Sequence, residues 1–506
     1  MSEELELKYS IEDAGQIAEW LDTAFPPAGD GWRSAIITDR YFDTPDHALA
    51  SAGVGARLRR TSGKTQLTFK SDIAVRGGLH RRLELEGPAT RALDPRRWPE
   101  SEARERLLAI TGERRLVERF VVRQRRRERE LVVGGSVMTA SIDIAVVRVG
   151  ITPVGELRQM EVELRGGSAA ALRRVGRRVA AGGLARPEPR SKFVMAAELA
   201  DAAAQVGAAD TLAEASRKVL HRQLLRMLER ETGVRADDQL ALKQMRVATR
   251  RMRAAWQLFG TAYKRADQRR YVAELRSVAR ALGEVRDVDV LLEWLPAQPG
   301  VESIGEAWRE RRSAAYEQLM KLLESREYRR FVDDYLELTA GRGGAVARRR
   351  AATTIGQAAP ALTGRTYREV LDEGGVAVGS SIDEAWHRLR IAGKRLRYAL
   401  EFLRPVLDDR AASELIRRVT RMQDVLGEMN DASVAATALE QWAAQAGTAA
   451  QQAAAVALAG ERRQHVGRLR RSFAPVWRGV SGVTFGRLLA RAVGETYTAN
   501  GVFTST

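Results

Sequence analysis

Apolar and charged side chains alternate with a period of two in one segment after another over the first two hundred residues. The first segment is Glu4-Leu5-Glu6-Leu7-Lys8, and a β-strand would place its two leucines on one face and its charges on the other. Further segments of this kind lie at residues 38–46, 57–59, 66–70, 82–86, 141–144 and 160–164, and another starts near residue 120. Seven or eight strands of this pattern can close into an antiparallel barrel.

Two barrels fit the alternation: one has an apolar interior and a charged outer face, and the other has a charged interior and an apolar outer face. The composition of the polar face distinguishes them. Its residues are mostly Glu, Asp, Arg and Lys, whereas a solvated face would also use Ser, Thr and Gln. The pattern therefore favours a charged interior, with the apolar faces packed against helices such as one predicted near residues 104–116. Buried charges of both signs are costly unless they pair or hold a ligand. A basic wall with carboxylates suits a polyphosphate and its divalent cations.

Composition limits the partners and the metal chemistry. The 506-residue chain has a net charge of +18, which predicts a polyanionic partner such as nucleic acid, acidic lipid or polyphosphate. It has no cysteine, so any metal must bind to oxygen ligands or to the five histidines. No apolar run approaches the roughly 20 residues that span a bilayer, and the acidic start lacks a signal-peptide core. We therefore expect a cytoplasmic protein.

An ordered set of motifs gives the first two hundred residues a family resemblance. They are ExExK at residues 4–8, Tyr-Phe-Asp-Thr-Pro-Asp at 41–46, Arg-Leu-Arg at 57–59, Leu-Thr-Phe-Lys at 67–70, Glu-Val-Glu-Leu at 161–164 and Ser-Lys at 191–192. Over residues 1–200 the set resembles the CYTH family, also called the triphosphate tunnel metalloenzymes. The resemblance implies an eight-stranded antiparallel β-tunnel that binds a triphosphate group end to end. Family members hydrolyse inorganic or thiamine triphosphate, and some are adenylate cyclases.

The resemblance also implies roles for individual residues. The implied metal ligands are Glu4, Glu6, Glu161 and Glu163, with Asp143 and Glu86 as further acidic candidates. The implied phosphate-binding residues are Lys8, Arg57, Arg59, Lys70, Arg82, Arg123, Arg125 and Lys192. Glu4, Glu6 and Lys8 would carry catalysis with Mg²⁺ or Mn²⁺, because carboxylates hold hard cations that polarise an attacking water. Five arginines crowd residues 123–129, and which of them face inward stays open.

The rest of the chain has a different pattern. Residues 201–210 form a linker rich in alanine and polar residues, residues 211–495 carry apolar residues at helix period, and residues 496–506 form a tail. Residues 242–253 align with residues 386–397, at an offset of 144 (386 − 242), and residues 282–287 align with residues 426–431 at the same offset. This repeat predicts a duplicated helical unit.

Each repeat carries a basic stripe on one helix face. The stripes are Lys243, Arg246, Arg250 and Arg253 in the first repeat, and His387, Arg390, Lys394 and Arg397 in the second. A solvated face is the ordinary explanation for a single basic helix. Solvated helices usually mix acids with bases, however, and these stripes contain no acid. Their presence in both repeats favours a polyanion-binding surface.

The repeat resembles the CHAD domain, named for conserved histidines in an α-helical fold, over residues 210–495. The resemblance implies two helical bundles related by a pseudo-twofold axis, which bind inorganic polyphosphate on a basic surface between them. His387 matches a family histidine, and Lys243 stands at the corresponding position of the first repeat. His221 and His465 lie in basic segments and are the other candidate positions.

Together the two parts predict an α+β triphosphate tunnel followed by an all-α domain of two bundles. The leading hypothesis is a metal-dependent triphosphatase that splits inorganic triphosphate into diphosphate and phosphate. Its helical domain would hold longer polyphosphate chains or attach the protein to polyphosphate granules. The alternatives are a non-catalytic polyphosphate-binding protein, an adenylate cyclase or other organic triphosphatase of the same family, and a nucleic-acid binder. Few aromatic residues interleave with the basic stripes, which argues against nucleic acid.

Overall fold

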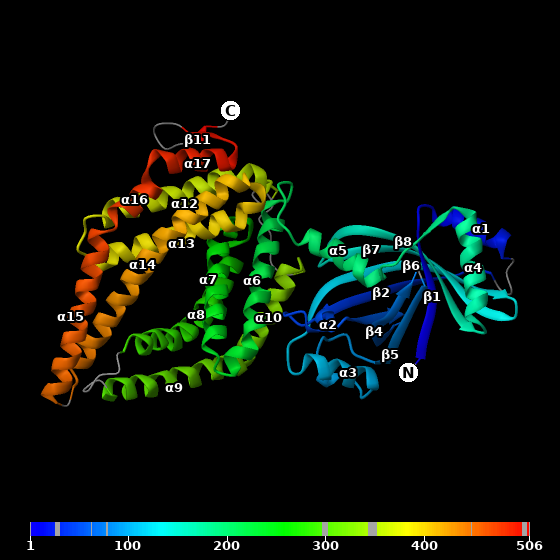
Figure 1. Ribbon diagram of the computed structural model, residues 1–506, viewed down its shortest axis with the longest axis horizontal. Helices are drawn as coiled ribbons and strands as arrows, with labels where there is room; N and C mark the ends of the chain where they lie inside the picture. Colours follow the sequence, from blue (N-terminus) through cyan, green and yellow to red (C-terminus); the bar gives the residue numbers. More distant parts are fainter. Residues whose placement is uncertain are drawn as a thin grey trace. The chain divides into compact units, whose positions relative to one another are not determined.

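The computed structural model describes residues 2–25, 31–61, 63–76, 79–295, 302–342, 352–446, 448–497 and 503–504, with the backbone alone at 2–4, 72–76, 79–82, 496–497 and 503–504. The chain divides into two compact units (Figure 1). Residues 1–204 with 340–342 form the first unit, and the rest of the chain forms the second. No described helix in either unit combines the length and the apolarity that a membrane span requires.

The first unit is built around an antiparallel sheet. Its strands are β1 (Ser2–Ile11), β2 (Arg33–Asp43), β3 (Val54–Thr61), β4 (Lys64–Arg76), β5 (Leu79–Pro88), β6 (Val117–Val133), β7 (Ser136–Val149), β8 (Thr152–Gly166) and β9 (Ala185–Pro187). They are hydrogen-bonded in the order β5-β4-β3-β2-β6-β7-β8-β1-β9, and β1 also pairs with β5. The strands β1 to β8 therefore form a ring, and β9 is a short addition to β1. The predicted antiparallel fold is confirmed.

Helices pack on the ring of strands, and all but one of those described lie on its apolar outer face. They are α1 (Ala14–Ala24), α2 (Ala48–Ser51), α3 (Glu102–Thr111), α4 (Ala169–Gly182) and α5 (Lys192–Ala203), with a short 3-10 helix η1 (Pro95–Arg97). α1 and α4 pack on the outer face of β1, β7 and β8, and α2 and α3 pack on the outer face of β3 to β5. α5 instead packs on the inner face of β6 to β8, beside Phe120, Val122, Ala145 and Val147. Because side chains alternate along a strand, the charged residues between the outward apolar ones face the interior. The interior of the ring therefore carries the charged residues, as the sequence predicts, except beside α5, where the inner face is apolar.

The second unit is helical. Its described helices are α6 (Leu212–Arg235), α7 (Gln239–Phe259), α8 (Arg265–Trp294), α9 (Glu302–Glu324), α10 (Arg326–Thr339), α12 (Ile355–Ala377), α13 (Asp383–Leu403), α14 (Asp409–Ala443), α15 (Ala449–Arg471), α16 (Ala474–Ser481) and α17 (Val483–Val493). Two 3-10 helices, η2 (Gly260–Ala262) and η3 (Arg404–Val406), and the strands β10 (Thr496–Tyr497) and β11 (Phe503–Thr504) also belong to it. The predicted all-α domain is confirmed.

The two halves of the helical unit correspond closely. α13 begins and ends 144 residues after α7, and η3 lies 144 residues after η2. α6 and α12 both begin with a capping box, in which the threonine before the helix accepts a hydrogen bond from the third helical residue. The backbone N–H of Leu212 donates to the Thr353 carbonyl over 2.9 Å. The N–H of Ile355 donates to the Asp210 carbonyl over 2.7 Å, so the halves join by reciprocal bonds about a pseudo-twofold axis.

Gly374 and Gly375 of α12 form a matched pair for testing how α16 packs on this helix. A β-carbon on Gly374 would overlap the ring of Trp477, whereas one on Gly375 would meet nothing within 4 Å. We expect Gly374→Ala to lower the free energy of unfolding by about 1–3 kcal/mol, because the indole must move. Gly375→Ala should raise it by up to about 1 kcal/mol, because alanine favours a helix. Denaturant unfolding followed by circular dichroism measures both, and equal effects would contradict this packing.

Candidate functional site

Strand register brings charged residues of neighbouring strands together inside the ring. β1 and β8 pair so that Lys8 lies opposite Glu161, and β6 and β7 pair so that Arg126 lies opposite Asp143. Because β7 and β8 are also neighbours, the two pairs are adjacent. Lys192, the first residue of α5, reaches the same place. We call the resulting group the interior ion-pair network, and its members are Glu6, Lys8, Arg126, Asp143, Glu161 and Lys192.

Lys8 and Glu161 form the first part of the network. The Lys8 ammonium lies 3.1 Å from Oε1 of Glu6 and 3.1 Å from Oε1 of Glu161. Nη2 of Arg126 lies 2.8 Å from the other carboxylate oxygen of Glu161. Burial by itself would raise the pKa of Glu161, but the three neighbouring cations hold it well below its usual value. Glu161 is therefore ionised at neutral pH.

Asp143 anchors the second part of the network. Its Oδ2 accepts hydrogen bonds from Nζ of Lys192 and Nη2 of Arg126, both over 2.6 Å, and its Oδ1 accepts one from Nε of Arg126 over 2.8 Å. Lys192 is positioned by the Ser191 hydroxyl, which caps the start of α5. Burial opposes ionisation, but Lys192 and Arg126 lower the pKa of Asp143. The network thus sets three cations against three carboxylates and has no net charge.

A separate group lies on β2 and β3. The buried carboxylate of Asp39 accepts hydrogen bonds from Nη1 of Arg57 over 3.2 Å and from Nε and Nη2 of Arg59 over 2.8 and 2.9 Å. The Tyr41 hydroxyl lies 3.2 Å from Nη1 of Arg57. Burial would raise the pKa of Asp39, but the two arginines lower it to about 2. The sequence analysis did not identify Asp39 as a site residue, although Asp39 and Tyr41 are two residues apart and therefore lie on the same face of β2.

Three further predicted residues also have described ion-pair or hydrogen-bonding partners. Lys70 pairs with Glu84 of β5 over 2.9 Å. Glu86 accepts a hydrogen bond from Gln66 over 2.8 Å. Glu163 lies opposite Glu6 in the strand register and pairs with Arg165 over 2.7 Å.

The structure places Arg123 and Arg125 away from the interior, contrary to their expected phosphate-binding role. Both are exposed, because neighbouring residues of β6 alternate between the two faces. The inward positions belong to Gln124 and Arg126, which contact Lys192 and Asp143. The alternation was not apparent in the sequence, because the five arginines of residues 123–129 occupy both odd and even positions.

The surroundings of the carboxylates bear on their expected metal-binding role. The side chains of Glu4 and Arg82 lie outside the described residues. Among the described residues, no three acidic or histidine side chains come close enough to hold a metal ion. Cationic side chains lie against Glu6, Asp143 and Glu161 instead. The oxygen donors suit Mg²⁺ or Mn²⁺, but such an ion would have to replace those cations.

A second set of charges lies in the helical unit, where α7 and α13 pack against each other. We call it the central basic cluster, and its members are Arg246, Arg250, Arg390 and Lys394. Nη2 of Arg246 lies 3.0 Å from Asp287, and Nε of Arg250 donates to the Tyr398 hydroxyl over 2.9 Å. Among the described side chains, Arg390 and Lys394 have no hydrogen-bonding or ion-pair partner.

Like charges within the cluster oppose one another. Burial first, and then repulsion from the three arginines, lower the pKa of Lys394 to about 6. Burial also lowers the pKa of Arg390, with Asp431 opposing the shift. Lys394 is therefore mostly neutral at pH 7 unless a negative charge approaches it.

The other residues of the two predicted stripes have different surroundings. Lys243 and His387 are exposed. Burial and repulsion from neighbouring arginines outside the cluster lower the pKa of Arg253. Arg397 lies 3.6 Å from Glu401, the acid one turn further along α13. The cluster that joins the two halves is therefore smaller than the predicted stripes.

The two further histidines are held by local contacts. Nδ1 of His221 lies 3.0 Å from the Thr339 hydroxyl. Burial lowers the pKa of His221 to about 4, so this residue adds no positive charge at pH 7. Nε2 of His465 lies 2.7 Å from a carboxylate oxygen of Glu428.

Comparisons with known proteins follow the same division of the chain. The family model of the CYTH domain matches residues 2–191, and that of the CHAD domain matches residues 218–440. Two uncharacterised proteins from strains of Mycobacterium tuberculosis are each 23% identical to the chain over 437 residues. These matches cover 81% of this chain and 82% of each relative.

Solved structures are similar to the two parts separately. The CHAD domain from the plant Ricinus communis is 24% identical, with a TM-score of 0.47, over 55% of this chain and 94% of that one. PptA from Streptomyces chartreusis is 18% identical, with a TM-score of 0.45, over 53% and 99%. HpAC1 from Hippeastrum, which has a dominant triphosphatase activity, is 18% identical, with a TM-score of 0.32, over 38% and 95%. With its charged strand ring and its duplicated helical unit each matched by a family model, the protein joins a CYTH domain to a CHAD domain.

Proposed function

We propose that the CYTH domain hydrolyses inorganic triphosphate to diphosphate and phosphate with Mg²⁺ or Mn²⁺. The interior ion-pair network carries this proposal, because it pairs the cations that phosphate oxygens need with the carboxylates that a divalent ion needs. On binding, Lys8, Arg126 and Lys192 would pass from carboxylates to phosphate oxygens. The released carboxylates would hold the metal ion. This exchange keeps every buried charge compensated.

The residues around the network would divide between phosphate and metal. Those that would bind phosphate, in addition to the network cations, are Arg57, Arg59 and Lys70. Arg57 and Arg59 share the single carboxylate of Asp39, so one of these two positive charges is not neutralised. Those that would hold the metal ion are Glu6, Glu161 and Glu163, together with Glu4. When bound, the ion neutralises phosphate charge and polarises an attacking water.

Hydrolysis then needs no covalent nucleophile from the chain. The oxygen of a water molecule bonds to the terminal phosphorus and gives up a proton to the solvent, and the bridging P–O bond breaks with its electron pair leaving on the diphosphate. Lys8 and Arg126 would stabilise the charge that grows on the phosphate oxygens. Asp143 would act as a positioning residue, because it fixes Arg126 and Lys192.

A hydrolysis panel tests the proposed activity. Phosphate release is measured from triphosphate, ATP, thiamine triphosphate and long polyphosphate, each with Mg²⁺, with Mn²⁺ and with a chelator. We expect triphosphate to be hydrolysed fastest, and only with a divalent ion, because the network must exchange its cations for a metal-bound substrate. Cyclic AMP formed from ATP would indicate an adenylate cyclase instead. No turnover with any metal would leave only a binding role for the tunnel.

Arg126 and Arg125, neighbours on β6, give a matched test of the residues. Arg126→Gln should lower kcat/KM for triphosphate by about 100-fold, because it removes a charge-assisted donor from the interior. Arg125→Gln should change it by less than about twofold, since Arg125 is exposed. Thermal unfolding of both variants checks that each is folded. Equal losses of activity would contradict the placement of Arg126 as the inward residue.

We further propose that the central basic cluster binds inorganic polyphosphate. Support comes from Arg390 and Lys394, which are partly buried, form no ion pair with a described carboxylate, and receive only part of their counter-charge from Asp431. A polyphosphate chain would supply that charge to both halves at once, since α7 and α13 each contribute two cations. Chains held there could be delivered to the CYTH domain or could attach the protein to polyphosphate granules.

The pH dependence of binding tests the role of Lys394. Bound phosphate should return the lowered pKa of Lys394 towards its usual value, so binding takes up a proton above pH 6. The affinity for long polyphosphate should therefore fall as pH rises from 6 to 8, by up to about tenfold per unit. Lys394→Met should remove this dependence while the titration of polyphosphate itself stays the same. Isothermal titration calorimetry measures both proteins, and identical pH profiles would contradict the assignment.

A further inference from the structure

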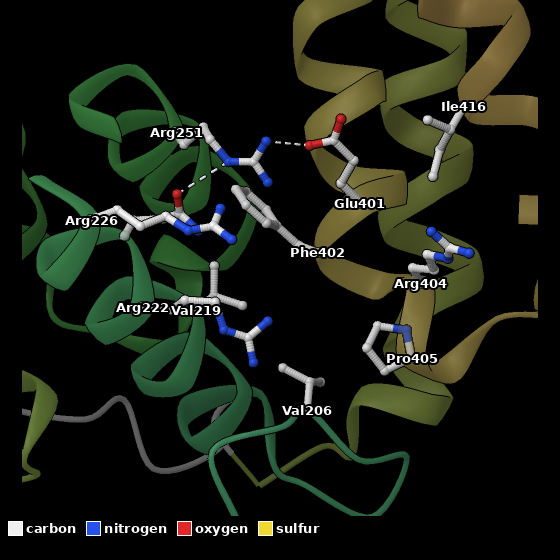
Figure 2. A pocket seen from close by; sticks show the side chains of 11 residues that line it. Val206, Val219, Arg222, Arg226, Arg251, Glu401, Phe402, Arg404, Pro405 and Ile416 are labelled. Atoms are coloured by element: carbon white, nitrogen blue, oxygen red, sulfur yellow. Dashed lines mark hydrogen bonds and ion pairs between the residues drawn. The ribbon is translucent and has the colours of Figure 1, made fainter. Parts of the chain in front are cut away.

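The helical unit has a cavity at the junction of its two halves. Figure 2 shows the side chains that line it. Its volume is about 350 Å³. α6 and α7 line it from the first half, and α13, η3 and α14 line it from the second. The lining residues are Val206, Val219, Arg222, Gln223, Arg226, Arg251, Glu401, Phe402, Arg404, Pro405 and Ile416. None of them belongs to the central basic cluster, so the cavity is not part of the proposed polyphosphate surface.

The residues that line the cavity include four arginines and one acid, Glu401, although Arg404 also pairs with Asp409 outside the lining over 2.9 Å. Arg251 pairs with Glu401 across the two halves and donates to the side-chain oxygen of Gln223 over 3.1 Å (Figure 2). The guanidinium of Arg226 has no hydrogen-bonding partner in the described part of the chain. Arg226 is an exposed residue, and partial burial with repulsion from Arg251 and Arg222 lowers its pKa against the attraction of Glu229 and Glu401. An anion in the cavity would relieve this repulsion.

The duplication supplies an internal comparison for the excess charge. α12 begins 143 residues after α6, so Arg226 corresponds to Glu369, and at the offset of 144 Arg251 corresponds to Arg395. In the second half, Glu369 neutralises Arg395 over 3.3 Å. In the first half, Arg226 occupies the position that corresponds to Glu369, so Arg251 has no such acid beside it. The excess charge is therefore a property of one half and does not follow from packing that both halves share.

The rest of the cavity wall is apolar and comes from Val206, Val219, Phe402, Pro405 and Ile416. A bare inorganic phosphate chain would leave this wall against water, whereas a ligand with an anionic and an apolar part would cover it. The volume lies in the range of small-molecule sites, about 300–1,000 Å³. We propose that the cavity binds a nucleoside diphosphate or triphosphate, with its phosphates among the arginines and its nucleoside against the apolar wall.

Equilibrium dialysis of the full chain against ADP, GDP, CDP and UDP tests this proposal. A chelator removes divalent ions, and excess inorganic triphosphate fills the tunnel and the central basic cluster. At least one diphosphate should bind at one site per chain, and its phosphate-free nucleoside should not compete. Arg226→Glu, which introduces the acid of the corresponding position, should weaken this binding by at least about tenfold.

Arg365→Glu is the matched control. Arg365 is exposed on α12, lies outside the cavity and undergoes the same change of charge, so binding should stay within about twofold. Circular dichroism checks both folds, and Arg226→Gln replaces Arg226→Glu if the latter unfolds. Saturable binding of none of the four nucleotides, equal losses in both variants, or displacement of the nucleotide by inorganic triphosphate would each overturn the proposal.

Discussion

The pairing of opposite charges inside the strand ring is the interaction on which the CYTH domain depends. Lys8, Arg126 and Lys192 are taken out of water only because Glu161 and Asp143 accept their hydrogen bonds. Removing one partner of such a buried pair typically costs about 3–5 kcal/mol, since the other charge is left uncompensated. The inward charge also turns apolar strand faces outward, and the helices α1 to α4 are then needed to cover them.

The CHAD domain treats buried charge in the opposite way. Its central basic cluster gathers like charges from two halves, and Lys394 responds by a lowered pKa rather than by pairing with an acid. The CYTH domain therefore neutralises its buried cations with its own carboxylates. The CHAD domain leaves an excess of positive charge that an external anion would neutralise. Our proposals for the two domains follow from this difference: an exchange of partners in the ring, and the supply of missing counter-charge in the helical unit.

The sequence predicted those features that depend on a clear period. Alternation identified the strands and their inward faces, and the offset of 144 anticipated the correspondence of α7 with α13. The prediction failed where the period was ambiguous. On β6, arginines occupy both odd and even positions, so Arg123 and Arg125 were predicted to face inward in place of Arg126. Asp39 was missed because its importance depends on its pairing with Arg57 and Arg59 of another strand. The burial and the partners of the predicted CHAD residues depend on how the helices pack against one another. The sequence pattern of a single helix does not contain that information.

The most direct test of the partner exchange is a crystal structure with Mn²⁺ and a non-hydrolysable triphosphate analogue. The account predicts an anomalous Mn²⁺ signal beside Glu6, Glu161 and Glu163, with the Lys8 ammonium moved from the carboxylates to a phosphate oxygen. The present contacts of Lys8, 3.1 Å to Glu6 and 3.1 Å to Glu161, are the reference for that movement. An analogue bound elsewhere, with these contacts intact and no Mn²⁺ in the ring, would contradict it.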